Sequence, residues 1–421
     1  MGYLKPISIS LSPNVEKDDV KLALNLIIRP WLWRKGKSAK ELEDEFKQYL
    51  EVKYAISFNS GRSALYAILR ALGASKGSIL LQAFTCNAAI NPVLWAKMSP
   101  VYVDCNTKTY NIDIEDLKQK IAENPDAKIL MIQHTFGQPA NMDEIMFIVR
   151  QNGLMLIEDS AHALGAEWNG QKIGTFGKAG FFSFSRDKVI SCVYGGMAVT
   201  DDPDLAEKLR LSQSEFGMPN LFWIKQQLLH PILLHFIILP VYNFLNLGKL
   251  FLILSQWLHV LSKAVHWKEK RGLKPNYFPR AMPNALSILA LNQFTKLDKF
   301  YNHRKKISNY YAENLKGTKF ILPAENSLIK QSYLRFTVQH PKAHEIIYDS
   351  WHKQNILLGD WYTTPIAPHD TKPAEMRYKT GMCKNAEWLS RRTLNLPTHI
   401  NISMKDAEKI VKFLEKYESK K

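Results

Sequence analysis

The chain alternates short β-rich runs with amphipathic helical stretches from Tyr54 to about Thr200. This alternation is typical of parallel strands joined by crossover helices. We expect helices at 40–50 and 112–121 and strands at 54–58, 78–82, 101–104, 128–133, 154–158 and 180–184. Ligands of such sheets bind at the carboxyl ends of the strands, so residues just past each strand are the first candidates for a functional site.

After Pro203 the pattern changes. The segment from Leu221 to Val265 is apolar almost all round, and from Asn284 an amphipathic helix leads into a mixed α/β stretch. The chain therefore divides into a large α/β domain with an N-terminal arm, a hydrophobic helical insertion, and a helix with a smaller α/β C-terminal domain. We place these three parts at residues 1–215, 216–280 and 281–421.

The charge of the chain indicates an anionic neighbour. Lys and Arg number 56 against 39 Asp and Glu, which gives a net charge of +17. Phosphate, lipid headgroups and nucleic acid would each satisfy this charge, but no nucleic-acid reader motif is present, so we expect no nucleic acid. The cysteines have no metal-ligand or disulfide spacing, so we expect no metal site and free thiols in the cytoplasm at Cys86, Cys105, Cys192 and Cys383.

Two residues that follow strands have the chemistry of a pyridoxal phosphate site. Asp159 comes directly after an apolar strand, and Lys188 follows the next strand in a turn that contains serines. A lysine amine can bind the cofactor aldehyde as a Schiff base, and a carboxylate can keep the pyridine nitrogen protonated. A structural ion pair would place the same residue types there equally well.

A second feature fits the phosphate end of such a cofactor. Ser60, Gly61 and Ser63 stand between a strand and a helix whose leucines recur at helical spacing. Exposed amides at a helix start attract phosphate, and Arg62 would add positive charge. An ordinary helix cap is the alternative interpretation of this turn.

Six ordered motifs resemble those of a known family, the DegT/DnrJ/StrS group of pyridoxal phosphate-dependent sugar aminotransferases. They span about residues 30–215 and 282–415 and read NSGRSAL, HTFGQPANMDEI, IEDSAHALGA, GTFGKAGFFSFSRDK, YGGMAVTDD and CKNAEWLSRRTLNLPTHINIS. The resemblance implies the aspartate aminotransferase-like fold, called fold type I, with a mostly parallel sheet. It also implies a homodimer with composite active sites that moves an amino group, usually from glutamate, to a keto sugar carried on a nucleotide.

The resemblance assigns roles to individual residues. Lys188 becomes the Schiff-base lysine and proton shuttle, and Asp159 the partner of the pyridine nitrogen. Ser183 matches a phosphate-binding serine, and Ser60 and Gly61 lie in the turn that holds the phosphate in relatives. His162 stands where relatives generally have a glutamine near the phenolic oxygen of the cofactor, and an imidazole can also donate a hydrogen bond there.

Other positions depart from the family pattern. Arg62 replaces the usual threonine of the phosphate turn, and Cys86 takes the place of an aromatic residue that lies against the cofactor ring. Tyr194 and Pro279 also differ, the latter where relatives reach into the partner's site. These departures motivate an alternative in which the chain is a catalytically inactive relative that acts as a membrane-associated scaffold or regulator.

The hydrophobic insertion suggests contact with a membrane. Residues 226–248 carry no Lys, Arg, Asp or Glu, and a basic cluster follows the helix expected over 250–265. An apolar helix beside basic residues fits peripheral docking of residues 221–266 on the inner face of the membrane, where a lipid-linked keto sugar would be accessible. The alternative is that these helices pack against protein, in a dimer or over the sheet.

Overall fold

A seven-stranded sheet forms the centre of the computed structural model, which describes residues 5–73, 77–324 and 326–418. Its order is β2-β11-β10-β7-β6-β3-β5, with only β11 antiparallel to its neighbours. The strands are β2 Tyr54–Phe58, β3 Ser78–Gln82, β5 Ser99–Val103, β6 Ile129–Gln133, β7 Met155–Asp159, β10 Ala179–Ser183 and β11 Gly196–Thr200. All six predicted strands are confirmed, while β11 was not predicted.

β11 contains a glycine for a steric reason. A Cβ on Gly196 would lie 2.4 Å from both the backbone nitrogen of Gly61 and the carbonyl carbon of Ser60. The strand therefore passes directly against the turn between β2 and the helix α3 (Gly61–Ala71), and only a residue without a side chain permits this approach.

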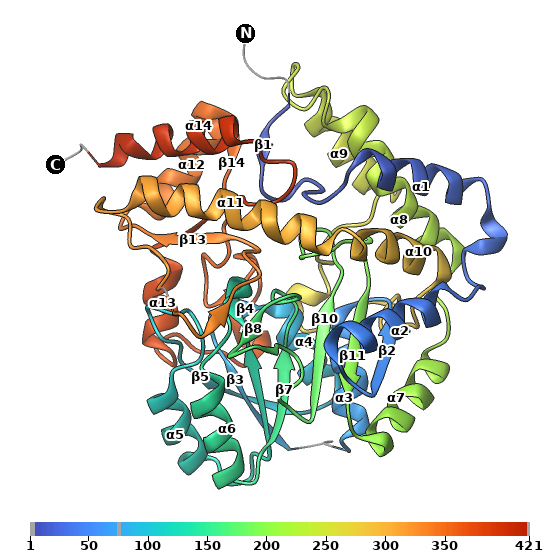
Figure 1. Cartoon of the computed structure of the whole chain (residues 1–421), viewed down its shortest axis with the longest axis vertical. Helices are drawn as coiled ribbons and strands as arrows, with labels where there is room; N and C mark the ends of the chain where they lie inside the picture. The colour runs from blue at the N-terminus through green and yellow to red at the C-terminus, as the bar shows by residue number, and fades with distance from the viewer. Residues whose placement is uncertain (1–4, 74–76, 325, 419–421) are drawn as a thin grey trace.

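Helices cover both faces of the sheet (Figure 1). One face carries α3, α4 and α7, and the other carries α2, α5 and α6, with α10 packed on α2. Their bounds are α2 Ser38–Leu50, α3 Gly61–Ala71, α4 Asn87–Trp95, α5 Ile114–Glu123, α6 Met142–Gln151, α7 Pro203–Phe216 and α10 Asn284–Phe294.

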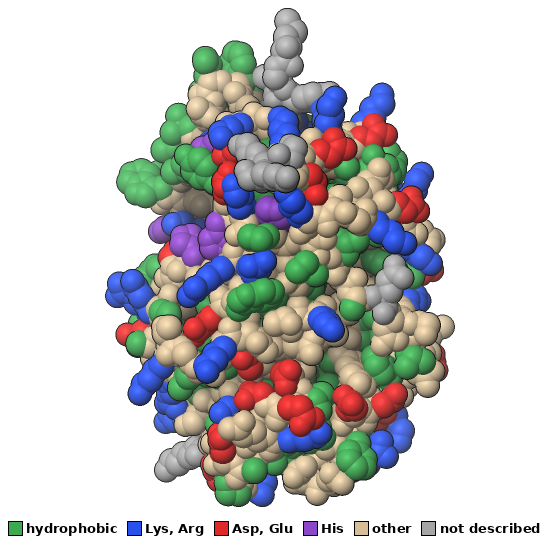
Figure 2. Space-filling model, turned by 90° about the vertical axis from the view of Figure 1, so that its left-hand side faces the viewer, with side chains coloured by type: hydrophobic (Ala, Val, Ile, Leu, Met, Phe, Trp, Pro, Cys, Tyr) green, Lys and Arg blue, Asp and Glu red, His purple; other side chains and the backbone are tan. Residues whose placement is uncertain are grey.

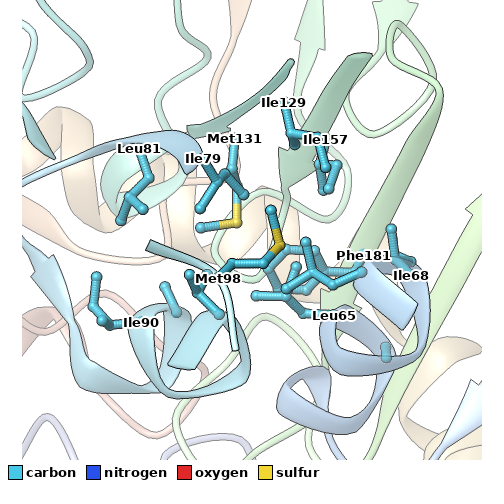
Figure 3. Close-up of a cluster of buried hydrophobic side chains, with 14 of the residues drawn as sticks. Leu65, Ile68, Ile79, Leu81, Ile90, Met98, Ile129, Met131, Ile157 and Phe181 are labelled. Atoms are coloured by element: carbon cyan, nitrogen blue, oxygen red, sulfur yellow. The ribbon is translucent and has the colours of Figure 1, made fainter. Parts of the chain in front are cut away.

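Successive strand residues supply the two faces with separate cores, because strand side chains alternate. On β10, Phe181 packs toward α3 while Phe182 packs toward α2. Figure 3 shows the first of these cores, where Leu65 and Ile68 of α3 meet Ile157 of β7 and other strand side chains.

The smaller domain has its own core. The elements after α10 are α11 Leu297–Leu315, β12 Ile329–Lys330, β13 Phe336–Gln339, α12 Ala343–Gln354, β14 Ile356–Leu357, β15 Ile366–Ala367, α13 Lys384–Ser390, β16 Thr393–Leu396 and α14 Met404–Leu414. Of these, β15 and α13 pack into the core that α3 shares with the large sheet. Three short pairings tie this domain to the rest of the chain: β1 (Ile7–Ser8) with β14, β4 (Thr85–Cys86) with β15, and β8 (Glu167–Trp168) with β12. β8 also pairs with β9 (Gln171–Lys172).

The first half of the hydrophobic insertion packs against protein. α8 (Leu221–Leu233) lies on α1 (Lys17–Ile27), and its Trp223, Ile224 and Leu228 join the core beside α2. The helix continues through a π-helical turn and ends at Ile238, shortly before Pro240. Among the described residues, 221–238 is the one helical stretch apolar and long enough to cross a bilayer, and 56% of it is buried inside the protein.

The second half of the insertion projects from the molecule. α9 (Leu247–Trp257) lies at the upper end in Figure 1, and Gly248 is its only buried residue. The predicted apolar face continues to Leu258, but the helix does not extend to 265 as expected. Leu261 is buried, and Val265 lines a cavity in the large domain.

Glu158, the residue before Asp159 on β7, stabilises the fold. Its carboxylate is fully buried and accepts hydrogen bonds from the amides of Gly174, Phe176 and Gly177 at 2.7–2.8 Å. We predict that Glu158→Gln lowers the free energy of unfolding by about 2 kcal/mol. The glutamine side chain has an NH2 group in place of one carboxylate oxygen, so at least one of the buried backbone N–H groups loses its acceptor. Denaturant unfolding measures this loss. Glu45→Gln, on exposed α2 surface, is the control, and equal stability of both variants would contradict the prediction.

Candidate active site

A cavity of about 180 Å³ opens at the carboxyl ends of β6, β7 and β10. This is the edge of the sheet where the sequence pattern placed a ligand site. Residues from the large domain, from the segment after α9 and from the smaller domain all contribute to the wall. Seven of the predicted site residues line it: Gly61, Arg62, Cys86, Asp159, His162, Ser183 and Lys188.

Asp159 and Lys188 face this same cavity and influence each other's charge. Burial raises the pKa of Asp159, while the amide of Ala161 and the Lys188 ammonium counteract this effect. Burial lowers the pKa of Lys188, and the carboxylates of Asp187 and Asp159 oppose that shift. The lysine is therefore closer to a neutral, nucleophilic amine than an exposed lysine would be.

Gly61 and Ser183 form the end of the cavity that suits a phosphate. A Cβ on Gly61 would lie 3.0 Å from the Ser183 Cβ and 3.4 Å from its Oγ, so the helix start and the end of β10 meet here. Ser60 does not line the cavity. Its hydroxyl caps α3 by accepting the Ser63 amide at 3.0 Å, as the cap interpretation expected.

Arg62 is engaged by the segment that follows the insertion. Its guanidinium forms a buried ion pair with Glu269 and donates to the Ala264 carbonyl at 3.2 Å. Burial alone would lower the pKa of Arg62, but the Glu269 carboxylate raises it above the ordinary value. Arg62 therefore holds residues 264–269 against the turn, and its charge is already neutralised by protein.

His162 is a neutral hydrogen-bond donor in the cavity. Burial, followed by the nearby Lys188 and Arg335 charges, lowers its pKa well below the usual value. Its Nδ1 accepts the Phe136 amide at 3.2 Å, so the ring proton is on Nε2. The predicted capacity to donate a hydrogen bond is thus consistent with the geometry.

Trp361 supplies an aromatic ring to the cavity, where Cys86 takes the place of the aromatic residue expected from the family pattern. The indole stacks on His162 with centroids 5.0 Å apart, and the Lys188 Nζ lies 4.7 Å from its centroid. The Arg335 guanidinium packs 3.3 Å from the same centroid and pairs with Asp187 at 3.1 Å. Trp361 and Arg335 come from the smaller domain and were not predicted, since no local pattern connects them to the strand ends.

Gln133, Arg186 and Asp187 are among the polar residues of the cavity wall that the sequence analysis did not name as site residues. Gln133 ends β6, where the strand-end rule had a signal that could have found it. Arg186 and Asp187 lie two residues and one residue before Lys188. Arg186 donates to the Ser262 carbonyl and hydroxyl at 2.7 Å, while its buried Nε has no hydrogen-bond partner among the described residues.

These residues fit pyridoxal 5′-phosphate. Lys188 could hold the aldehyde, Asp159 the ring nitrogen, and the α3 start with Ser183 the phosphate, and Arg186, whose Nε has no partner among the described residues, lines the same cavity. A mainly parallel sheet with this set of groups at its strand ends defines a pyridoxal phosphate-dependent transferase of fold type I. The sequence pattern of the DegT/DnrJ/EryC1/StrS aminotransferase family matches residues 14–231 and 261–415, and the chain belongs to this family.

Comparison with known proteins agrees with this assignment. The chain is 27% identical over 419 residues to GDP-perosamine synthase of Caulobacter vibrioides, covering 99% of each chain. It is 27% identical over 384 residues to UDP-N-acetyl-3-dehydro-α-D-glucosamine 3-aminotransferase of Acidithiobacillus ferrooxidans, covering 90% of this chain and 89% of that one. The PLP form of a Streptococcus pneumoniae protein described as a sugar aminotransferase superposes with a TM-score of 0.75 at 19% identity, covering 98% of each chain. The predicted family, fold class, aminotransferase activity and cofactor are confirmed.

The buried Arg62–Glu269 pair should stabilise the protein only when both partners are present. We predict that Glu269→Gln lowers the free energy of unfolding by about 3–5 kcal/mol, because it leaves a buried guanidinium unpaired. The double variant Arg62→Met with Glu269→Gln should regain most of this loss. Urea unfolding followed by circular dichroism measures both, and equal losses in the single and double variants would contradict the pairing.

The lowered pKa of Lys188 predicts a pH dependence of cofactor attachment. The neutral amine is the nucleophile, so the rate at which the cofactor-free protein attaches added PLP should rise with pH, with a midpoint below the ordinary lysine value of 10.5. Asp187→Asn removes a carboxylate that raises this pKa, so the midpoint should move to lower pH. Stopped-flow absorbance at a series of pH values measures the rate. A midpoint at 10.5 or above would contradict the prediction.

Proposed function

We propose that this aminotransferase transfers an amino group from glutamate to a keto sugar, linked to a nucleotide or a lipid, in the synthesis of cell-envelope polysaccharide or another glycan. The observation that carries the proposal is the shared cavity of Lys188 and Asp159, with Gly61 and Ser183 at its phosphate end. The sugar substrate is supported by the relatives, one of which is named for a UDP-linked 3-dehydro sugar.

Four residues near the cavity have a role in this reaction. Bound PLP would supply a ring that accepts electrons from the substrate carbon. The buried carboxylate of Asp159 would hold the proton of the ring nitrogen. The Lys188 amine would hold the cofactor aldehyde and serve as the base for the α-proton of the amino acid. His162 would donate through Nε2, and Trp361 would help to exclude water from the cavity.

The proposal includes a homodimer in the cytoplasm, peripheral on the inner face of the membrane. Composite active sites are a property of the resembled family, in which residues at the position of Pro279 reach the site of the partner subunit. The membrane location follows from the exposed apolar helix α9, which lies outside the two segments that match the family pattern.

An inactive scaffold is the second candidate, because Arg62, Cys86, Tyr194 and Pro279 depart from the family pattern. The contacts of two of these residues favour the enzyme. Arg62 pairs with Glu269, and the Tyr194 hydroxyl donates to the Lys263 carbonyl at 2.6 Å. Both substitutions thus serve to pack residues 263–269, and neither removes Lys188 or Asp159 from the cavity.

Absorbance spectroscopy separates the enzyme from the scaffold. We expect the protein reconstituted with PLP to show the visible band of lysine-bound cofactor, and L-glutamate to convert that band to the near-ultraviolet band of the aminated cofactor. Lys188→Ala should lose the visible band. Asp159→Asn should slow the glutamate-driven change by at least about a hundredfold, because the ring nitrogen loses its charged partner.

The control and the acceptor complete this test. Lys208→Ala, on exposed α7, should behave as the unchanged protein. Adding UDP-linked or GDP-linked keto sugars to the aminated form should restore the visible band, and the sugar that does so identifies the acceptor. A colourless protein that cannot be reconstituted would overturn the enzyme and favour the scaffold.

A further inference from the structure

α9 exposes apolar side chains on nearly every side. Trp257 is 73% exposed, Ile253 is 63% exposed, and the preceding Leu245 is 81% exposed. Figure 2 shows hydrophobic side chains gathered at the upper end of the molecule, the end where Figure 1 places α9. The exposed set is Phe244, Leu245, Leu250, Phe251, Ile253, Leu254, Trp257 and Leu258. An apolar surface this continuous on a protein indicates a binding partner.

A basic hollow of about 880 Å³ adjoins α9, and we call it the lysine groove. Six lysines line it, three of them on α14 and the turn directly after it, and none of its described lining residues is Asp or Glu. The lysines are Lys5, Lys249, Lys353, Lys409, Lys412 and Lys416. Exposed Trp351 also lines the groove, and tryptophan is a residue that favours the boundary between water and lipid.

The insertion itself joins the two surfaces. Lys249 belongs to α9 and lines the groove. Asn243, in the turn before α9, also lines it. The Asn243 amide also donates to the Asn355 side chain at the end of α12. The apolar helix and the groove are therefore fixed side by side, and one flat partner can contact both.

The positive charge around α9 indicates an anionic partner. From residue 216 to residue 297 the only acidic residue is Glu269, which is buried against Arg62. The apolar helix thus has basic neighbours and no exposed carboxylate of its own segment. A second copy of the chain would bring one lysine groove against another, and like charges would oppose that contact. An anionic lipid surface complements both the charge and the apolar side chains.

We propose that α9 and the lysine groove dock this protein on an anionic lipid bilayer, with the α9 side chains entering the headgroup region and the lysines contacting acidic headgroups. The docking surface specifies, by residue, the membrane location that is part of the proposed function. The evidence for docking is independent of the reaction that the enzyme catalyses. The segment 232–260, absent from the family match, then supplies the apolar part of this docking surface.

Vesicle flotation of the PLP-loaded full chain tests the proposal. The protein should float with vesicles of phosphatidylcholine and phosphatidylglycerol and stay in the dense fraction with phosphatidylcholine alone. Phe251→Ser with Ile253→Ser and Trp257→Ser should abolish flotation. Lys412→Gln with Lys416→Gln should lower the partition coefficient by about 25-fold, since each lysine near an anionic leaflet strengthens binding about fivefold.

Matched variants and two further readouts make the outcome decisive. Phe147→Ser, at an exposed position of α6, and Lys128→Gln with Lys208→Gln should float as the unchanged protein does. The visible cofactor band, measured in every sample, should be unchanged, so failure to dock is distinguished from failure of the proposed enzyme. If the protein does not float with vesicles that contain phosphatidylglycerol, the proposal is wrong. If light scattering shows that only the α9 variant loses self-association, the face binds a second copy and the proposal is likewise overturned.

Discussion

The opposite charges of Lys188 and Asp159, brought into one buried cavity, are the interaction on which the rest of the site depends. Two parallel neighbours, β7 and β10, end at the same edge of the sheet and carry these residues at or just past their ends. Burial raises the pKa of Asp159 and lowers the pKa of Lys188, which favours the neutral form of each side chain. The attraction between the two charges opposes both shifts. The lysine can therefore act as a nucleophile while a carboxylate remains beside it, which is the condition that pyridoxal phosphate chemistry requires.

The insertion and the departures from the family pattern are parts of one structural change. The chain leaves the large domain through α8, projects as α9, and returns to cover the cavity with residues 262–269. Arg62, Arg186 and Tyr194 all bond this returning segment. Arg62, which belongs to the turn at the start of α3, thus anchors this part of the cavity wall. This arrangement places the proposed lipid-binding surface, whose exposed apolar set ends at Leu258, close in sequence to Ala264 and Val265 of the cavity wall.

Most of the sheet could be predicted because its strands are apolar runs of ordinary length, bounded by polar turns. β11 was missed because its beginning, Gly196, has no side chain to show a strand pattern, and its glycine is required by contact with Ser60. The site residues at strand ends followed from one rule of parallel sheets. Trp361 and the Arg335 that packs on it could not be predicted in the same way, because Trp361 reaches the cavity only through the packing of the smaller domain. The apolar stretch 221–265 was similarly ambiguous, since periodicity does not distinguish a helix buried against α1 from one exposed to solvent or lipid.

The sequence by itself determined the alternation of strands and helices, the lysine and carboxylate of the site, the turn for a phosphate, and the excess of positive charge. These are local properties, fixed by residue type and spacing. The tertiary structure alone decided that Arg62 is neutralised by Glu269, that an indole from the smaller domain covers Lys188, and that five lysines from distant segments join Lys249 of α9 in one groove. Each of these depends on contacts between segments far apart in the chain, and such contacts form only when burial of apolar surface has brought the segments together.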